Sequence, residues 1–183
     1  MTTVAVIVGS LRRDSINRLL AQAMAKLAQP KGLAFSLLRQ DDIPMYNEDL
    51  WEKPPAAVLR LKDEIKVAGA VLFVTPEYNR SIPALIKNTL DWASRPTGQS
   101  VWPGKAAGIV GATPGATGTA AAQAHLRSIL TVFGLALVSR PEIYIALKPG
   151  AIAADGTVED EGLRKLLDGY LDAFKSWIDR VGP

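Results

Sequence analysis

The chain alternates short apolar runs with segments in which apolar residues recur every three or four positions. Five runs indicate strands, at residues 4–8, 33–38, 67–74, 105–111 and 135–138. Runs that are apolar at nearly every position are typical of strands covered on both faces. Helical segments lie between them, at residues 15–28, 55–67, 82–93 and 117–133. This alternation predicts right-handed βαβ units and an α/β fold with a five-stranded parallel sheet.

The clearest helical pattern lies near the end of the chain. Eight apolar residues fall on one face at i, i+3, i+4 spacing: Leu163, Leu166, Leu167, Tyr170, Leu171, Phe174, Trp177 and Ile178. A core helix lying on the sheet is favoured over a cofactor or partner surface, because amphipathic helices usually pack inward. No internal repeat or linker is visible, so we expect a single domain over residues 1–183.

Composition narrows the possible chemistry. The 183 residues are 48% hydrophobic and 21% charged, as expected for a compact domain that buries roughly 70% of its unfolded surface. The chain has no cysteine and one histidine, His125, which excludes thiolate nucleophiles, iron–sulfur ligation and a multi-histidine metal site. Any electron transfer therefore requires an organic cofactor.

Charge and hydropathy indicate where the protein acts. The net charge of +3 suits an anionic ligand, but the basic residues are scattered, so nucleic acid is not expected as a partner. The longest apolar stretch, residues 129–138, is well short of the roughly 20 residues of a membrane span. The first residues lack the basic and apolar regions of a signal peptide. We therefore expect a cytoplasmic protein that does not interact with membranes.

An open parallel sheet binds ligands beyond the carboxyl ends of its strands, which directs attention to three loops. The first, residues 9–17, leads into a helix, whose free N–H groups and dipole favour an anion. Four side chains there suit a phosphate: Ser10, Arg12, Ser15 and Asn17. Neither a Walker A motif nor GxGxxG is present, so a monophosphate is favoured. The alternative is that Asp14 or Ser15 simply caps the helix.

The second and third loops differ in character. In residues 75–83, two prolines fix the loop shape, and Tyr78 lacks apolar neighbours at helical spacing, which suits a ring packed on a flat heterocycle. For Glu77, a structural hydrogen bond or salt bridge is favoured over a general base, because no proton-relay partner is apparent. Residues 111–118 contain three glycines and no large side chain, which lets the main chain approach a ligand or simply forms a turn.

Two further features have structural interpretations. His125 lies in the helix predicted after the third loop, several residues beyond the crevice, and a structural histidine is favoured over a catalytic one. Residues 40–51 include four acids, which would suit Mg²⁺, but a mobile flap or a subunit contact is favoured.

Several motifs together resemble a known family. The phosphate motif G-S-x-R-x-x-S-x-N is filled at every specified position from Gly9 to Asn17. The P-E-Y-N motif spans residues 76–79, S-x-P follows at residues 81–83, and the characteristic helix phrase K-N-T-L-D-W spans residues 87–92. Over nearly its whole length the chain is similar to the NAD(P)H-dependent FMN reductases of the flavodoxin-like superfold, near the bacterial quinone, azo-dye and chromate reductases.

This resemblance implies a flavodoxin-like three-layer sandwich that binds FMN and uses NADPH or NADH as co-substrate. The reaction would follow a ping-pong mechanism, in which the pyridine nucleotide leaves before a small acceptor binds. The acceptors would be quinones, azo dyes, chromate or free flavin. It implies no catalytic acid–base residue and no metal. It also implies a homodimer or homotetramer, with residues 42–51 as the expected contact.

The resemblance assigns thirteen cofactor-binding residues. Those of the phosphate loop are Ser10, Arg12, Ser15, Ile16 and Asn17. Those beside the flavin ring are Pro76, Glu77, Tyr78, Asn79 and Arg80, and those on its pyrimidine side are Thr113, Pro114 and Gly115. Arg80 occupies a variable position, where it either meets the phosphate of NADPH or faces solvent.

Three other functions remain open. A flavodoxin-type electron carrier would share the fold and the cofactor, but such carriers are usually strongly acidic. A flavin-free regulatory domain would keep only the anion pocket. A hydrolase of phosphorylated small molecules is disfavoured, because no metal cluster or nucleophile constellation is present.

Overall fold

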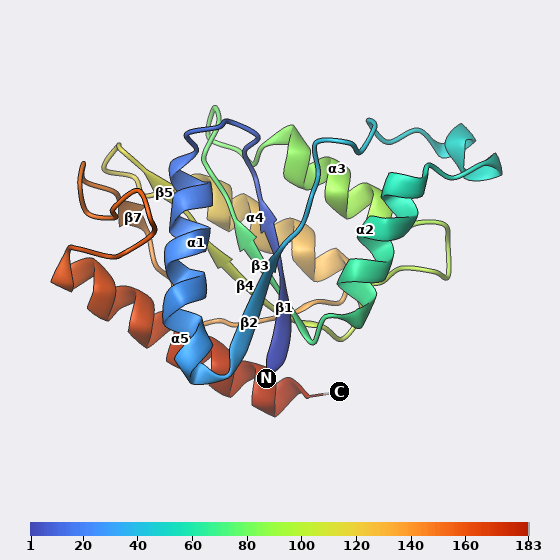
Figure 1. Ribbon diagram of the computed structural model, residues 1–183. Helices are drawn as coiled ribbons and strands as arrows, with labels where there is room; N and C mark the ends of the chain where they lie inside the picture. Colours follow the sequence, from blue (N-terminus) through green and yellow to red (C-terminus); the bar gives the residue numbers. More distant parts are fainter. Residues whose placement is uncertain (183) are drawn as a thin grey trace.

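The computed structural model describes residues 1–182, which form three layers: a central parallel sheet with a layer of helices on each face (Figure 1). The sheet has five strands in the order β2-β1-β3-β4-β6. Their bounds are β1 Thr2–Val8, β2 Leu33–Leu37, β3 Ala70–Val74, β4 Ala106–Val110 and β6 Ala136–Leu137. The predicted α/β fold with five parallel strands is confirmed.

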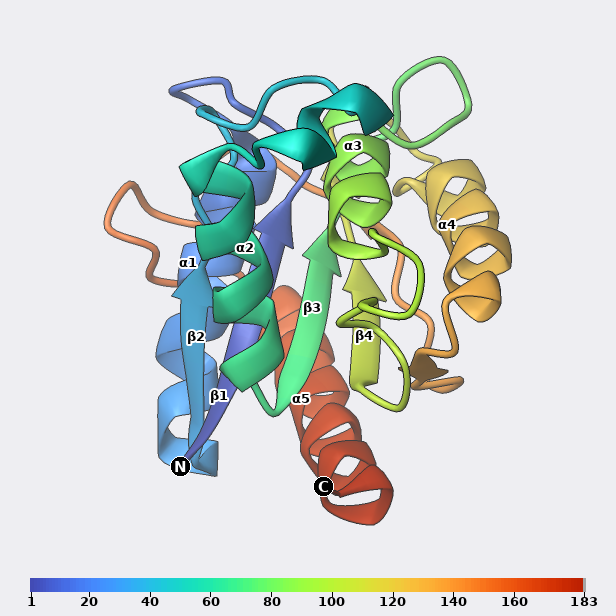
Figure 2. The same cartoon turned by 90° about the vertical axis from the view of Figure 1, so that its right-hand side faces the viewer.

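Helices cover both faces of the sheet (Figures 1 and 2). One face carries α1 (Ile16–Ala28) and α5 (Glu161–Val181); the other carries α2 (Ala56–Val67), α3 (Ala84–Ala93) and α4 (Ala120–Val132). In β1, Val4 and Val6 join the first apolar layer, whereas Ala5 and Ile7 join the second. Because successive strand residues point to opposite faces, both layers require apolar side chains, which explains the continuous apolar runs.

The shorter elements were not all predicted. A two-stranded parallel sheet joins β5 (Ala112–Thr113) to β7 (Ile145–Ala146), and its strands are too short to leave a periodic signal. Two 3₁₀ turns, η1 (Gln29–Lys31) and η2 (Glu48–Glu52), complete the elements.

Some predicted boundaries and one predicted core residue were wrong. Residue 67 ends α2 and its side chain is largely exposed, so the strand predicted to start there begins at Ala70. Leu166 belongs to the apolar stripe of the last helix, yet it is 41% exposed, whereas Leu163 and Leu167 on the same stripe are buried in the core. The helix predicted over residues 82–93 begins after Pro83, and the one predicted over residues 117–133 begins at Ala120.

The parallel arrangement decides where a site forms. The direction in which successive strands are added to the sheet reverses between β1 and β3. The connections that follow these two strands therefore leave on opposite faces of the sheet, which opens a crevice at its carboxyl edge. The loops after β1, β3 and β4 reach this edge, at the tips of the arrows in Figure 2. Within residues 1–182, no helix is both long and apolar enough to cross a membrane.

Candidate functional site

A small cleft of about 130 Å³ lies where the three loops meet. Its lining comes from all of them: Ser10, Arg12, Ser15, Ile16, Asn17, Pro76, Glu77, Tyr78, Ala112, Thr113 and Pro114. Three of the residues assigned from the sequence, Asn79, Arg80 and Gly115, are absent from this lining. One lining residue, Ala112, was not predicted, since its contribution is made by the main chain.

The first loop places polar groups at the start of α1. Ser15 is the N-cap of that helix, and its hydroxyl oxygen accepts a hydrogen bond from the Arg18 N–H at 3.2 Å. The Ser10 side chain is buried, and its hydroxyl oxygen lies 3.4 Å from the Arg12 N–H. The side chain of Arg12 is exposed at the cleft. Capping by Ser15 is therefore confirmed, and the same residue also lines the cleft.

Asn17 joins the first loop to the third. Its side-chain amide is buried, donates to the carbonyl oxygen of Ala112 at 2.9 Å and accepts from the Ala112 N–H at 2.9 Å. One amide hydrogen of Asn17 remains for a ligand. This pair of bonds fixes the distance between the start of α1 and β5, which is the width of the cleft.

The first and second loops pack closely because residue 9 is a glycine. A Cβ atom there would lie 2.8 Å from Pro76 Cδ and 2.9 Å from Ile86 Cδ1, closer than such carbons pack. Any larger residue would therefore separate the two loops that line the cleft.

Glu77 has a structural role of the kind expected. Its carboxylate accepts hydrogen bonds from the N–H groups of Ala121 at 3.0 Å and Ala122 at 3.2 Å. These are free N–H groups in the first turn of α4, where a negative charge also complements the helix dipole. The next residue, Tyr78, is 46% exposed and lines the cleft.

His125 lies closer to the second loop than its position in the sequence suggested. It sits on α4 as expected, but its Nδ1 is 2.9 Å from the hydroxyl oxygen of Ser81. Sequence separation gave no signal of this contact, which depends on how α4 packs beside the loop after β3.

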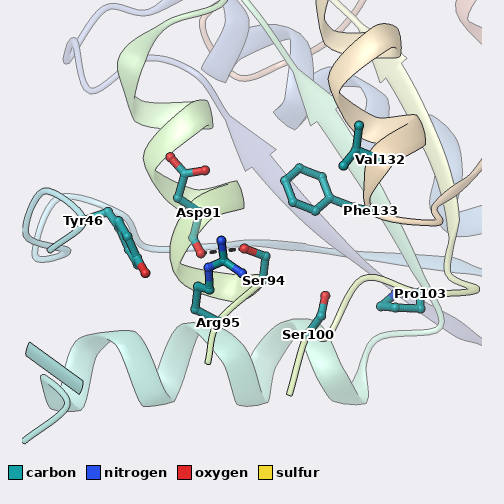
Figure 3. Close-up of a pocket in the computed structure, with 8 residues that line it drawn as sticks. All are labelled: Tyr46, Asp91, Ser94, Arg95, Ser100, Pro103, Val132 and Phe133. Carbon is teal, nitrogen blue, oxygen red and sulfur yellow. Dashed lines mark hydrogen bonds between the residues drawn. The ribbon is translucent and has the colours of Figure 1, made fainter. Parts of the chain in front are cut away.

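A larger hollow of about 580 Å³ lies elsewhere, beside the end of α3 (Figure 3). Tyr46 borders it on one side and Phe133, next to the end of α4, on the other. Its acidic group, Asp91, is already paired with Lys87 at 2.6 Å. No residue of the three loops lines this hollow, so the cleft at the carboxyl edge remains the candidate site.

The expected long loop before α2 is pinned to α3. The Tyr46 N–H donates to Asn88 Oδ1 at 2.7 Å, and the indole N–H of Trp92 donates to the Pro44 carbonyl at 2.8 Å. The Trp51 ring packs edge-on against Trp92.

In the described part of the chain, no group of three or more His, Cys, Asp or Glu side chains is placed to hold a metal ion.

Residues 2–150 match the model of the NADPH-dependent FMN reductase family. The chain belongs to this family. It is therefore an oxidoreductase that uses FMN with NAD(P)H. Among solved structures, the flavoenzyme NAD(P)H:(acceptor) oxidoreductase FerB from Paracoccus denitrificans is 51% identical, with a TM-score of 0.97 and 100% of both chains covered.

The curated relatives of this FMN reductase include proteins named as quinone reductases. A 2-hydroxy-1,4-benzoquinone reductase from a Burkholderia species is 45% identical, over 96% of this chain and 95% of the relative. A quinone reductase from Pseudomonas putida is 42% identical, over 96% and 94%. These similarities confirm the predicted flavodoxin-like fold and the predicted enzyme class.

Proposed function

We propose that this protein reduces quinones with NADPH or NADH through FMN bound in the cleft at the carboxyl edge of the sheet. The observation that carries the proposal is the meeting of a phosphate-type loop, an exposed tyrosine and a small-residue loop in one cleft. The names of the quinone reductases that this chain resembles support the choice of acceptor.

The residues present fit FMN. The hydroxyls of Ser10 and Ser15 and the guanidinium of Arg12 gather at the N-terminus of α1, where donors and the helix dipole favour a phosphate. We infer that Ile16 and Asn17 complete this end of the site. At the other end, we infer that the main chain of Thr113, Pro114 and Gly115 faces the polar edge of the ring, since these residues leave the backbone accessible.

In this proposal the second loop borders the flavin ring. Pro76, Glu77 and Tyr78 line the cleft, and we infer that Asn79 and Arg80, which follow them in the loop, lie at its rim. When bound, FMN supplies the redox chemistry, taking electrons from the nicotinamide and giving them to the acceptor. The protein side chains fix its position, and none acts as a general acid or base.

We further propose a ping-pong order, in which oxidised nicotinamide leaves before the acceptor binds in the same place. Two reactants that use the same face of the flavin cannot bind together, so the nicotinamide must leave before the acceptor binds. The same arrangement favours a range of small acceptors, including azo dyes, chromate and free flavin, because the flavin supplies the reactivity.

The test is the visible spectrum of the protein reconstituted with FMN under anaerobic conditions. We expect the flavin bands to bleach with NADPH or NADH and to return when a benzoquinone is added. Steady-state rates should give parallel double-reciprocal lines for a ping-pong order. Bound flavin that resists both nucleotides would instead support an electron carrier, and failure to bind FMN would refute the proposal.

The phosphate assignment has its own test. Arg12→Ala is expected to weaken FMN binding by about 1–3 kcal/mol, the range for losing a hydrogen bond to a charged group. Arg13→Ala is the matched control, because Arg13 is also exposed but lies outside the cleft lining. Equal FMN affinity in the two variants would contradict the assignment.

We also propose that residues 1–183 form one domain and assemble as a homodimer or homotetramer, with residues 42–51 at the contact. Met45 is 70% exposed in that segment, and the hollow bordered by Tyr46 lies next to it, which supports a contact there. Analytical ultracentrifugation should give two or four times the 19.6 kDa of one chain. A monomer at micromolar concentration would refute the assembly.

A further inference from the structure

The turn that follows Tyr78 has an unusual backbone. Tyr78 and Ser81 exchange two main-chain hydrogen bonds of 3.0 Å, and the two residues between them, Asn79 and Arg80, have φ values of 51° and 66°. Both are left-handed and neither is glycine; asparagine tolerates this conformation, whereas for arginine it is costly and persists where surrounding contacts hold it. Support from outside the turn therefore helps to hold Arg80 in this conformation.

That support comes from α4 at two places. The Glu77 carboxylate binds the N–H groups of Ala121 and Ala122 at the start of α4. One helical turn further along, His125 Nδ1 lies 2.9 Å from the Ser81 hydroxyl. The two contacts flank the turn, one before Tyr78 and one after Arg80, so together they fix its orientation over the sheet.

The turn borders the cleft, but His125 does not. Tyr78 lines the cleft with an exposed ring, and the exposed side chain of Arg80 follows it. A reactant that approaches FMN in the cleft passes this edge, and the positive charge of Arg80 suits the phosphates of a pyridine nucleotide. The position of both side chains depends on the turn that the Ser81–His125 hydrogen bond holds.

We infer that His125 is a positioning residue for pyridine-nucleotide binding, acting through Ser81 on Tyr78 and Arg80. This inference rests on the proposed FMN site. It predicts that loss of the Ser81–His125 bond weakens NAD(P)H binding more than FMN binding, because the hydrogen bonds of the phosphate loop at the start of α1 do not involve this pair.

The experiment compares four variants of the FMN-loaded enzyme: His125→Ala, Ser81→Ala, the double variant and His125→Asn. We expect each single alanine variant to raise the KM for NADPH about three- to tenfold, the size expected for one hydrogen bond, with kcat changed less than about twofold. The double variant should show no larger rise than either single one, because both remove the same bond. His125→Asn should restore a low KM, since its amide oxygen can accept from Ser81.

Ser128→Ala is the matched control. Ser128 is exposed on the same helix, close to His125 in the sequence, and it does not line the cleft. Its KM should equal that of the unmodified enzyme. Unchanged KM values in both single alanine variants, or effects that multiply in the double variant, would overturn the inference. Failure of the unmodified protein to bind FMN would instead refute the proposed function.

Discussion

Replacing Asn17 by alanine tests whether this residue mainly holds the cleft together or mainly binds the phosphate. In the structure its amide pairs with both main-chain groups of Ala112, at 2.9 Å each. The variant leaves a buried N–H and a buried C=O without a partner. Each such group costs about 1–3 kcal/mol, and water from the adjacent cleft relieves part of the cost, so we expect a loss of about 2–4 kcal/mol in the free energy of unfolding.

The measurement is urea unfolding of the chain freed of FMN, so that ligand binding contributes nothing to the difference. Arg12→Ala is the matched comparison, because Arg12 lines the same cleft with an exposed side chain. We expect Arg12→Ala to leave the stability of this form nearly unchanged and to weaken FMN binding. If Asn17→Ala has normal stability without FMN and loses only FMN affinity, the reasoning from its two hydrogen bonds is refuted.

Two further predictions concern the frame around the site. In Gly111→Ala, the new Cβ would collide with the carbonyl oxygen of Thr75 and the hydroxyl of Thr119. Thermal unfolding should therefore show a loss of about 1–3 kcal/mol in the free energy of unfolding. The control is Gly169→Ala, in an open position of α5, which should be neutral or stabilising. Burial lowers the pKa of the Lys105 ammonium group, whose hydrogen bonds go to the carbonyls of Lys66 and Ala68. The folded chain then releases this proton at a lower pH than the unfolded chain, so this group's contribution to stability should rise as the pH increases through the lowered pKa toward 10.5. Urea unfolding over that range should show the rise in the unmodified protein and a smaller one in Lys105→Met; equal slopes would contradict the shift.

Much of the fold was predictable because burial on both faces leaves a direct mark on the sequence. Each strand of the main sheet coincides with an apolar run, the helices α1 to α4 coincide with segments between runs, and α5 coincides with the apolar stripe near the end of the chain. The errors fall where that mark is weak. The β5–β7 pair has two residues per strand, and Leu166 shows that an apolar stripe can be wider than the contact it makes.

For the candidate site, the sequence by itself determined which loops carry polar and small residues, because parallel strands bring their carboxyl ends to one edge. It also determined the likeness to the FMN reductases, through side chains at fixed spacing in the first two loops. Only the tertiary structure decided that Asn17 forms hydrogen bonds with Ala112, that Glu77 accepts hydrogen bonds from the first turn of α4 and that His125 forms a hydrogen bond with Ser81. Each of these contacts joins residues more than 40 positions apart, and two of them use main-chain groups, which are identical at every residue type except proline and therefore leave no signal in the sequence.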